Sequence, residues 1–221
     1  HNNGVKNTAG GYYSFINATI HVSPEVIIEN GVMIINEGKI VEAGTNLKTP
    51  KGAVEIDLKG KHIYPSFIDL YSTYGMPEVK RGQWNPAPQY ETNKKGAFNW
   101  NESIKPETRS AELFTAESKS AAEYRNLGFG TVLTHQQDGL MRGTSTLTTL
   151  ADKKENLTVL NTDAAAHYSF RKGNSAQQYP SSLMGCIALI RQTYFDAKWY
   201  ATQTDKKEEN LSLAAFNKTQ N

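Results

Sequence analysis

The first quarter of the chain alternates between short apolar runs and glycine-containing turns. β-Branched and aromatic residues are frequent from Tyr12 to Val22, and further apolar runs follow at 26–28, 32–35, 40–41 and 54–58. Asn30-Gly31 and Glu37-Gly38 separate the central runs, and such pairs are typical of tight turns between antiparallel strands. The pattern therefore predicts a β-meander.

The next stretch, Gly60–Gly75, consists of a turn glycine, a short apolar run and then polar residues. The glycine permits a tight turn, and Ile63, Phe67 and Ile68 belong to a run that we expect to be buried on both faces. Asp69 lies where this run meets polar residues. The stretch predicts a buried strand that ends at a functional site.

Residues 76–105 form a long polar segment with several aromatic residues, among them Trp84 and Trp100. A connection of this length without hydrophobic periodicity is usually functional or disordered. Two interpretations are open. Either the loop covers a substrate and its aromatic side chains line a pocket, or it packs those side chains over its own domain or against a partner.

After this loop the pattern changes to helices that are followed by glycine and a short strand. Pro106 favours the start of a helix that runs to about Leu127 and ends at Gly128, and residues 129–134 are then predicted to be a buried strand. Further strands are expected at 143–150 and 157–160.

The clearest helix begins at the serine cap in Pro180-Ser181-Ser182, and a last short helix is expected at 211–216. In the helix that begins after Ser182, spacings of three and four residues define an apolar stripe, which we expect to pack against a sheet. The stripe comprises Leu183, Ile187, Ile190, Tyr194, Ala197 and Ala201.

Candidate chemistry lies at the ends of these predicted strands. His135 and Asp138 suggest either a metal or acid–base site or ordinary hydrogen-bonded structure. His167 is a second candidate ligand, with packing or hydrogen bonding as its alternative role. Arg171 and Lys172 either hold an anionic group or flank the glycine turn that follows them. The candidate site-lining residues are Asp69, Trp84, Trp100, His135, Asp138 and His167.

The run Gly60-Lys61-His62-Ile63-Tyr64-Pro65-Ser66-Phe67-Ile68-Asp69 is similar to the segment that opens the barrel of metal-dependent amidohydrolases, as in imidazolonepropionase-like proteins. Residues 17–44 resemble the small β-domain before this barrel, and residues 127–132 resemble the sequence before its second strand. The resemblance implies an α/β fold with a polar tail at 1–11 and a small β-sandwich-type domain at 12–62. Residues 63–221 would form the first part of a (β/α)8 TIM-like barrel that is incomplete in this chain.

The resemblance also implies a place for a metal, where this sequence departs from the family pattern. The family continues as Asp-x-His-x-His, and both histidines bind the catalytic metal from one face of the first strand. Tyr71 and Thr73 occupy these positions here, and neutral hydroxyl groups are poorer ligands for transition metals than imidazole. We therefore expect no cofactor for this chain alone. Zinc or another divalent metal near Asp69 and Tyr71 would need ligands from other segments.

Length and charge limit the remaining possibilities. The 221 residues carry a net charge of +2 with dispersed basic residues, which argues against nucleic acid as a partner, and no apolar run is long enough for a transmembrane segment. The single cysteine, Cys186, lies in an apolar helical pattern and is expected to be a core thiol. The polar start at His1 predicts an exported protein, periplasmic or at the cell surface.

A complete barrel needs roughly 250 residues, so we expect a complementary polypeptide, or the rest of the protein's own chain, to complete the fold. Two functions follow. The first is an amidohydrolase-like protein, which by resemblance hydrolyses non-peptide C–N bonds, but without family-type metal catalysis in this chain. The alternative is a non-catalytic binding or assembly subunit that uses a degenerate amidohydrolase fold.

Overall fold

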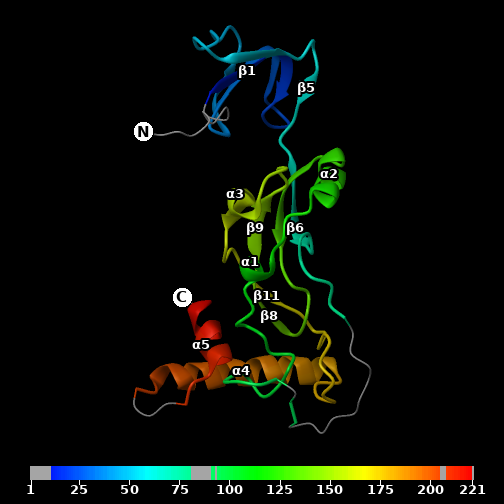
Figure 1. The fold of residues 1–221 in the computed structure, drawn as a ribbon, viewed down its shortest axis with the longest axis vertical. Coiled ribbons are helices and arrows are strands. Elements are labelled where there is room, and N and C mark those ends of the chain that lie inside the picture. The colour runs from blue at the N-terminus through cyan, green and yellow to red at the C-terminus, as the bar shows by residue number, and fades with distance from the viewer. Residues whose placement is uncertain (1–10, 81–90, 93, 205–207, 221) are drawn as a thin grey trace. The chain divides into compact units, whose positions relative to one another are not determined.

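The computed structural model describes residues 11–80, 91–92, 94–204 and 208–220 (Figure 1). The chain divides into two compact units, of which one ends at Ser66 and the other begins at Phe67. Each unit has its own buried apolar side chains. Among the described helices, none combines the length and the apolar character needed to cross a membrane.

The first unit is built on one five-stranded sheet. Its strands are β1 (Tyr12–His21), β2 (Ile27–Asn36), β3 (Lys39–Gly44), β4 (Val54–Asp57) and β5 (His62–Ile63). The predicted turn at Glu37-Gly38 joins β2 to β3, and β1, β2 and β3 are antiparallel neighbours, whereas β4 and β5 both run parallel to β1. The turn predicted at Asn30-Gly31 is wrong: the apolar runs on both sides of it belong to the single strand β2, in which Asn30 has a positive φ of 50° and Gly31 pairs with Ala18 beside a shift of register. Within residues 11–66 the strands form this single sheet rather than two facing sheets.

Strand β1 pairs with β2 on one side, and on its other side its parallel partner changes halfway along. Residues 13–16 pair with β4, and Thr19 and Ile20 pair with β5. Between them Asn17 has a positive φ of 55°, and its side-chain amide donates a hydrogen bond of 2.9 Å to Asp57. An asparagine tolerates this left-handed backbone better than most residues do, so the break in the ladder is encoded locally.

The described residues of the second unit form a four-stranded sheet, a separate strand pair and five helices. The sheet consists of β6 (Phe67–Ser72), β7 (Phe129–Thr134), β9 (Thr146–Thr149) and β10 (Val159–Asn161). The pair consists of β8 (Met141–Thr144) and β11 (Ala166–Tyr168). The helices are α1 (Ser110–Leu113), α2 (Ser118–Asn126), α3 (Glu155–Thr158), α4 (Leu183–Thr202) and α5 (Leu211–Lys218).

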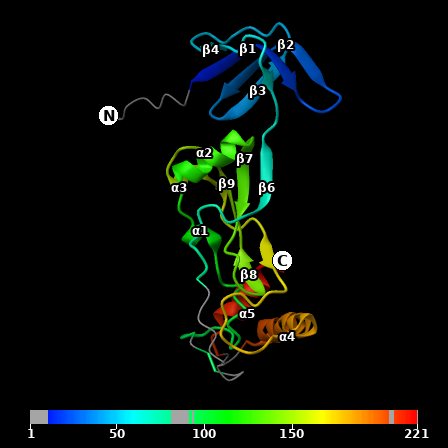
Figure 2. The same cartoon turned by 90° about the vertical axis from the view of Figure 1, so that its right-hand side faces the viewer.

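Only one strand pair of the four-stranded sheet is parallel. The order is β10-β9-β7-β6, in which β6 and β7 run parallel and the other neighbours run antiparallel. Figure 2 shows β6, β7 and β9 beside one another. The chain passes through α1 and α2 between β6 and β7, which is one β–α–β step. The described residues therefore form a mixed α/β fold, and the remainder of a TIM-like barrel is not shown by them.

Strand β6 lies at the edge of this sheet and is not buried on both faces. Phe67, Ile68 and Leu70 are 64%, 56% and 67% exposed. The prediction of a fully buried strand is wrong for the described chain, because β7 is the only strand that pairs with β6 among the described residues. An edge strand with several exposed apolar side chains is a surface that folded proteins normally cover.

The helix predicted from Pro106 to Leu127 is interrupted. Only α1 and α2 are helical, and Phe114 between them has an extended backbone. Here the backbone N–H of Thr115 donates to the carbonyl oxygen of Gly75 at 2.9 Å, and the Phe114 ring packs on Tyr74. Tertiary contacts thus replace a helical turn. Similarly, α3 occupies the start of the strand predicted at 157–160, and only its end lies in β10.

Helix α4 begins as predicted but buries a different face. The Ser182 hydroxyl accepts a hydrogen bond of 3.1 Å from the Gly185 N–H, which confirms the serine cap. The buried residues are Cys186, Leu189, Thr193, Ala197 and Tyr200, whereas Leu183 and Tyr194 of the predicted stripe are exposed. The helix packs on α5 and on Ile104, Leu140 and Met141, and these neighbours decide which face is covered. Cys186 is a core thiol, as predicted.

Candidate functional site

The ends of β6 and β7 lie side by side and bring two candidate residues together. Tyr71 is the next-to-last residue of strand β6, and His135 directly follows β7. The backbone N–H of His135 donates to the carbonyl oxygen of Ser72 at 3.1 Å. As a result, the Tyr71 and His135 rings meet edge to face with their centroids 5.0 Å apart.

The strand pair β8–β11 adds two further side chains. Arg142 comes from β8 and His167 from β11, and these strands pair through Ala166 with Thr144 and Tyr168 with Met141. His167 stacks on His135 with a centroid distance of 3.7 Å and an interplanar angle of 9°. Tyr71, His135, Arg142 and His167 therefore form one cluster, which we call the Arg142 cluster.

The Arg142 guanidinium is the centre of this cluster. It is only 6% exposed. Its Nη1 donates to the Tyr71 hydroxyl at 2.7 Å and faces His135 Nε2 at 3.4 Å, and its Nε donates to the Gly139 carbonyl oxygen at 3.2 Å. Because the guanidinium can only donate, His135 Nε2 is the acceptor and the neutral ring carries its proton on Nδ1.

Burial and positive charge keep both imidazoles neutral. Burial of the ring, followed by the charges of His167 and Arg142, lowers the pKa of His135 to about 3. Burial and Arg142 also lower the pKa of His167 below its usual value. Moreover, Nδ1 of His135 and Nε2 of His167 are buried without a hydrogen-bond partner among the described residues. Such orphaned polar atoms are costly and are typical of functional sites.

The cluster does not fit a divalent metal ion. Imidazole lone pairs lie in the ring plane, so two parallel stacked rings direct them side by side rather than toward one point. The guanidinium also places a permanent positive charge against Tyr71 and His135. Within the part of the chain that the structure describes, no group of three or more His, Cys, Asp and Glu side chains is arranged to hold a metal.

Tyr71 and Thr73, the two positions where the family resemblance implies metal ligands, do not face one site. Tyr71 lines a cavity together with Arg142, whereas Thr73 lines a different cavity next to Tyr74 and Leu113. Strand β6 ends at Ser72, so the alternation that would bring positions 71 and 73 to the same face stops between them. Tyr71 is thus separated from Thr73 and joined to Arg142.

Asp138 and Asp69 have local structural contacts. Asp138 is buried, forms an ion pair with Lys105, and accepts a hydrogen bond of 2.8 Å from the Asn174 backbone N–H. It anchors the loop at 172–175 rather than joining the histidine pair. The Asp69 carboxylate accepts a hydrogen bond of 2.9 Å from the Tyr71 N–H, which closes a turn within β6.

The two tryptophans of the long loop were candidate lining residues. Trp100 is 39% exposed, and its carbonyl oxygen accepts a hydrogen bond of 3.0 Å from the Gln177 side chain. It does not line the cavity beside Arg142. Trp84 lies outside the described residues, so its role as a lining residue stays a prediction.

The cavity beside the cluster, which we call the Arg142 cavity, has a volume of about 850 Å³. Its walls come from β6, from the segment after β7, from β8 and from the loop after β11. Its lining residues are Tyr71, Val79, Gln137, Arg142, Ser169, Arg171, Lys172 and Gly173. Three of them are cationic and none is acidic.

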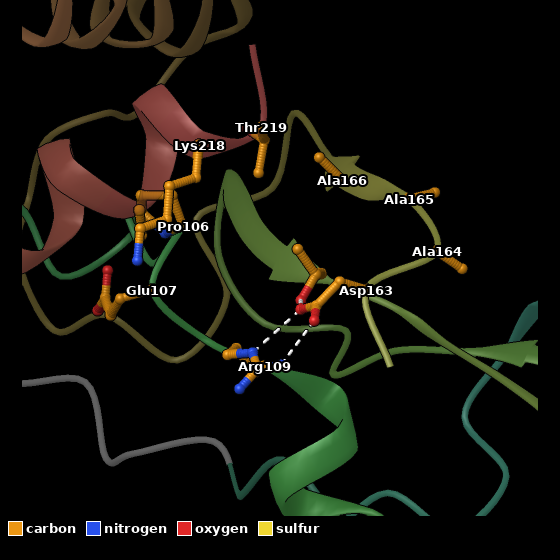
Figure 3. A pocket seen from close by; sticks show the side chains of 11 residues that line it. Pro106, Glu107, Arg109, Asp163, Ala164, Ala165, Ala166, Lys218 and Thr219 are labelled. Carbon is orange, nitrogen blue, oxygen red and sulfur yellow. Dashed lines mark hydrogen bonds and ion pairs between the residues drawn. The ribbon is translucent and has the colours of Figure 1, made fainter. Parts of the chain in front are cut away.

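A second cavity, of about 600 Å³, surrounds Arg109 and Asp163, and we call it the Arg109 cavity (Figure 3). Here the guanidinium is paired: Nη2 and Nε of Arg109 contact the two carboxylate oxygens of Asp163 at 2.6 and 3.0 Å. The pair lowers the pKa of Asp163 to about 2. Thr144 donates a further hydrogen bond of 2.9 Å to this carboxylate.

Sequence reasoning missed Arg142. It identified Tyr71, His135 and His167 separately, and only the pairing of β8 with β11 brings them around one guanidinium. A signal was present, because Arg142 is the only charged residue in the otherwise neutral run Gly139–Leu150. A charge in the middle of a predicted strand is unusual and calls for a partner or a ligand.

Comparison with known proteins supports the fold. No protein-family model matches the chain, and no curated protein matches it. A solved amidohydrolase from Thermotoga maritima is similar over 93% of this chain, with a TM-score of 0.67 and 19% sequence identity. The match covers 54% of that protein, so this chain spans about half of its length. A second solved amidohydrolase is 29% identical over 27% of this chain and 15% of its own length, with a TM-score of only 0.25. The described chain therefore has an amidohydrolase-like α/β fold.

Proposed function

We propose that this chain has the fold of an amidohydrolase-like protein without family-type metal catalysis, and that it serves as a binding or assembly subunit. The observation that carries the proposal is the contact between Arg142 and Tyr71. At a position where the resemblance implies a metal ligand, the phenol accepts a hydrogen bond from a buried cation. A divalent ion at the same place would be repelled by that charge.

Exposed apolar side chains on β6 support the assembly part of the proposal. Phe67, Ile68 and Leu70 are more than half exposed on an edge strand. The natural occupant of such an edge is another strand, which would satisfy the free backbone groups and cover the side chains. We propose that a complementary polypeptide, or the rest of the same chain, supplies it. Export to the periplasm or cell surface stays a prediction.

Metal content tests the first part. The protein is incubated with zinc, dialysed and measured by inductively coupled plasma mass spectrometry, and amide and cyclic-amide substrates are assayed in parallel. We expect far less than one ion per chain and no hydrolysis. Stoichiometric zinc together with hydrolysis of a C–N bond would overturn the proposal and favour the metal-dependent hydrolase that the family resemblance implies.

A histidine-restoring variant sharpens this test. Tyr71→His with Thr73→His recreates the family motif in sequence. Because positions 71 and 73 line different cavities, we expect no gain in zinc binding. Stoichiometric binding by this double variant would show that both side chains reach one site. The assembly part is tested by native mass spectrometry of the purified protein, in which a monomer that resists aggregation would argue against a strand partner.

A further inference from the structure

We propose that the Arg142 cavity binds the oxyanion group, a carboxylate or a phosphate, of a small molecule. The inference goes beyond the proposed function, since it assigns a ligand class to a site that neither the fold nor the missing metal motif specifies. It rests on three features: an uncompensated buried cation, a lining that offers donors, and a volume suited to a small ligand.

The charge of the cavity is not balanced by the protein. Arg142, Arg171 and Lys172 line it, and none of the described lining residues is a carboxylate. The buried Asp138, which contacts the neighbouring loop, is already engaged by Lys105 and by the Asn174 N–H. A buried charge without a counter-ion is expensive, and an anionic ligand provides that counter-ion.

Donor atoms remain available in the cavity. Nε and Nη1 of Arg142 are used, but Nη2 has no hydrogen-bond partner among the described residues. The Tyr71 hydroxyl accepts from Arg142, so its own proton is free to be donated. Likewise, the Ser169 hydroxyl accepts from the Arg171 N–H at 3.0 Å and keeps its proton for a ligand. Guanidinium and hydroxyl donors together are the usual partners of carboxylate and phosphate oxygens.

The loop that carries Arg171 and Lys172 is held in one shape. Gly173 has a φ of +71°, and a Cβ atom there would lie 2.0 Å from the Asp138 carboxylate. The Lys172 ammonium donates to the Gln177 carbonyl oxygen at 2.6 Å, which fixes its position beside the cavity. Preorganised cations lower the entropic cost of binding an anion. A cavity of about 850 Å³ has room for a small molecule around the bound group.

Calorimetric titration of the full chain with inorganic phosphate and with succinate tests this inference. Both titrations are run at constant ionic strength set with sodium chloride, so that general screening is the same throughout. We expect saturable binding of at least one of the two anions. Phosphate without succinate would assign a phosphate group, and succinate without phosphate a carboxylate. Absence of saturable binding for both would overturn the proposal.

Matched variants locate the site. Arg142→Gln should weaken binding at least about tenfold, because it removes a charge-assisted hydrogen bond. Arg171→Gln combined with Lys172→Gln tests the same cavity through exposed or half-buried side chains and remains informative if Arg142→Gln fails to fold. Arg109→Gln combined with Lys218→Gln is the control, since it removes the same two charges from the Arg109 cavity. Equal weakening by this control and by the Arg171/Lys172 variant would show non-specific attraction and overturn the proposal.

The calorimetric titration measures anion binding and does not depend on metal content or on a protein partner. A negative result would leave the proposed function untouched, because the contact of Arg142 with Tyr71 does not depend on a bound anion. Conversely, stoichiometric zinc would contradict the proposed function and not the oxyanion site. The two proposals can therefore fail separately.

Discussion

The Arg109 and Arg142 cavities of the second unit differ in how the protein surrounds the guanidinium group. Arg109 is exposed enough to contact water and is held by both oxygens of Asp163. Arg142 is almost fully buried, and its neighbours are a phenol, a carbonyl oxygen and a neutral imidazole. Among the described residues, the more deeply buried of the two cations is therefore the one that no carboxylate contacts.

This difference separates a structural charge from a candidate functional one. The Arg109–Asp163 pair ties the start of α1 to the segment before β11, and exposed pairs of this kind contribute little to stability. The Arg142 cluster instead retains two buried imidazole nitrogens without a partner among the described residues, together with the positive charge of Arg142. Proteins tolerate such an arrangement where a ligand completes it.

The largest expected effect concerns the backbone that joins the two cavities. Gly143 follows Arg142, has a φ of +78°, and approaches Thr108, the residue before Arg109, so closely that a Cβ atom would lie 1.8 Å from its carbonyl oxygen. Gly143→Ala should lower the free energy of unfolding by more than about 3 kcal/mol or prevent folding. Urea denaturation followed by circular dichroism measures this.

Gly128→Ala is the matched control for this variant. Gly128 also has a positive φ, of 92°, but the nearest atom to an added Cβ is a Phe67 ring carbon at 3.3 Å. In Gly128→Ala only the strain of a left-handed alanine should remain, and it should lower the free energy of unfolding by about 1 kcal/mol. Equal losses in the two alanine variants would show that the contact with Thr108 does not constrain the Arg142 segment.

Acid should destabilise the folded protein through His135 and through Asp163, in two different pH ranges. The folded pKa of His135 is about 3, below its unfolded value of 6.5, so the unfolded state binds the extra proton between these values. Stability should therefore fall as the pH drops below 6.5, by about 1.4 kcal/mol per pH unit from this residue. For Asp163 the folded pKa is about 2 against 3.8 unfolded, so its smaller contribution is lost only as the pH falls from 3.8 toward 2.

Variants separate the two pH ranges. His135→Gln should flatten the loss of stability between pH 6.5 and 4 relative to the unmodified protein, and Asp163→Asn should leave that range unchanged. Chemical denaturation at a series of pH values provides the curves. An unchanged slope in His135→Gln would mean that the buried imidazole is not kept neutral in the folded protein.

Removal of each guanidinium should have unequal effects on stability. Arg142→Gln leaves the Gly139 carbonyl oxygen and the Tyr71 hydroxyl without their donor and should cost about 1–3 kcal/mol. Arg109→Gln breaks an exposed pair and should cost at most about 1 kcal/mol. Urea midpoints compare the two directly, and a greater loss in Arg109→Gln would reverse the assignment of structural and functional charges.

Tyr71→Phe should have a smaller effect than Arg142→Gln. This variant deletes a single hydroxyl that accepts from Arg142 at 2.7 Å, while the ring contact with His135 stays. The loss of unfolding free energy should be about 0.5–1.5 kcal/mol. Anion affinity should fall less than in Arg142→Gln, because the guanidinium remains. A thermal melt and the same calorimetric titration give both values.

Much of the local structure could be predicted from sequence. The antiparallel strands β1 to β3, the turn at Glu37-Gly38, the strand at Phe129–Thr134 and the serine cap of α4 are present, because turn glycines, β-branched runs and capping hydroxyls act over a few residues. The other predicted turn, Asn30-Gly31, lies inside β2. Predictions about burial were weaker. The expected burial of β6 and the expected stripe of α4 depend on which distant segments pack there.

The candidate site shows the same limit. Tyr71, His135 and His167 each stood out as single polar residues near strand ends, but their spacing in sequence gave no reason to stack one imidazole on the other. Asp138 looked equally suitable for chemistry, and its ion pair with Lys105 shows that it anchors a loop. Side chains that are far apart in sequence acquire a common role only through strand pairing.

The amino-acid sequence by itself determined the strands of the first unit, the turn at Glu37-Gly38 and the start of α4, and the family resemblance pointed to Tyr71 and Thr73 as the positions where metal-binding histidines are expected. The tertiary structure alone decided that Tyr71 faces Arg142, that Thr73 faces another cavity, and that one arginine has a carboxylate while the other has none. The physical reason is the distance in sequence over which each effect acts. Backbone preferences act between neighbouring residues, whereas the burial and compensation of a charge depend on every segment that the fold brings around it.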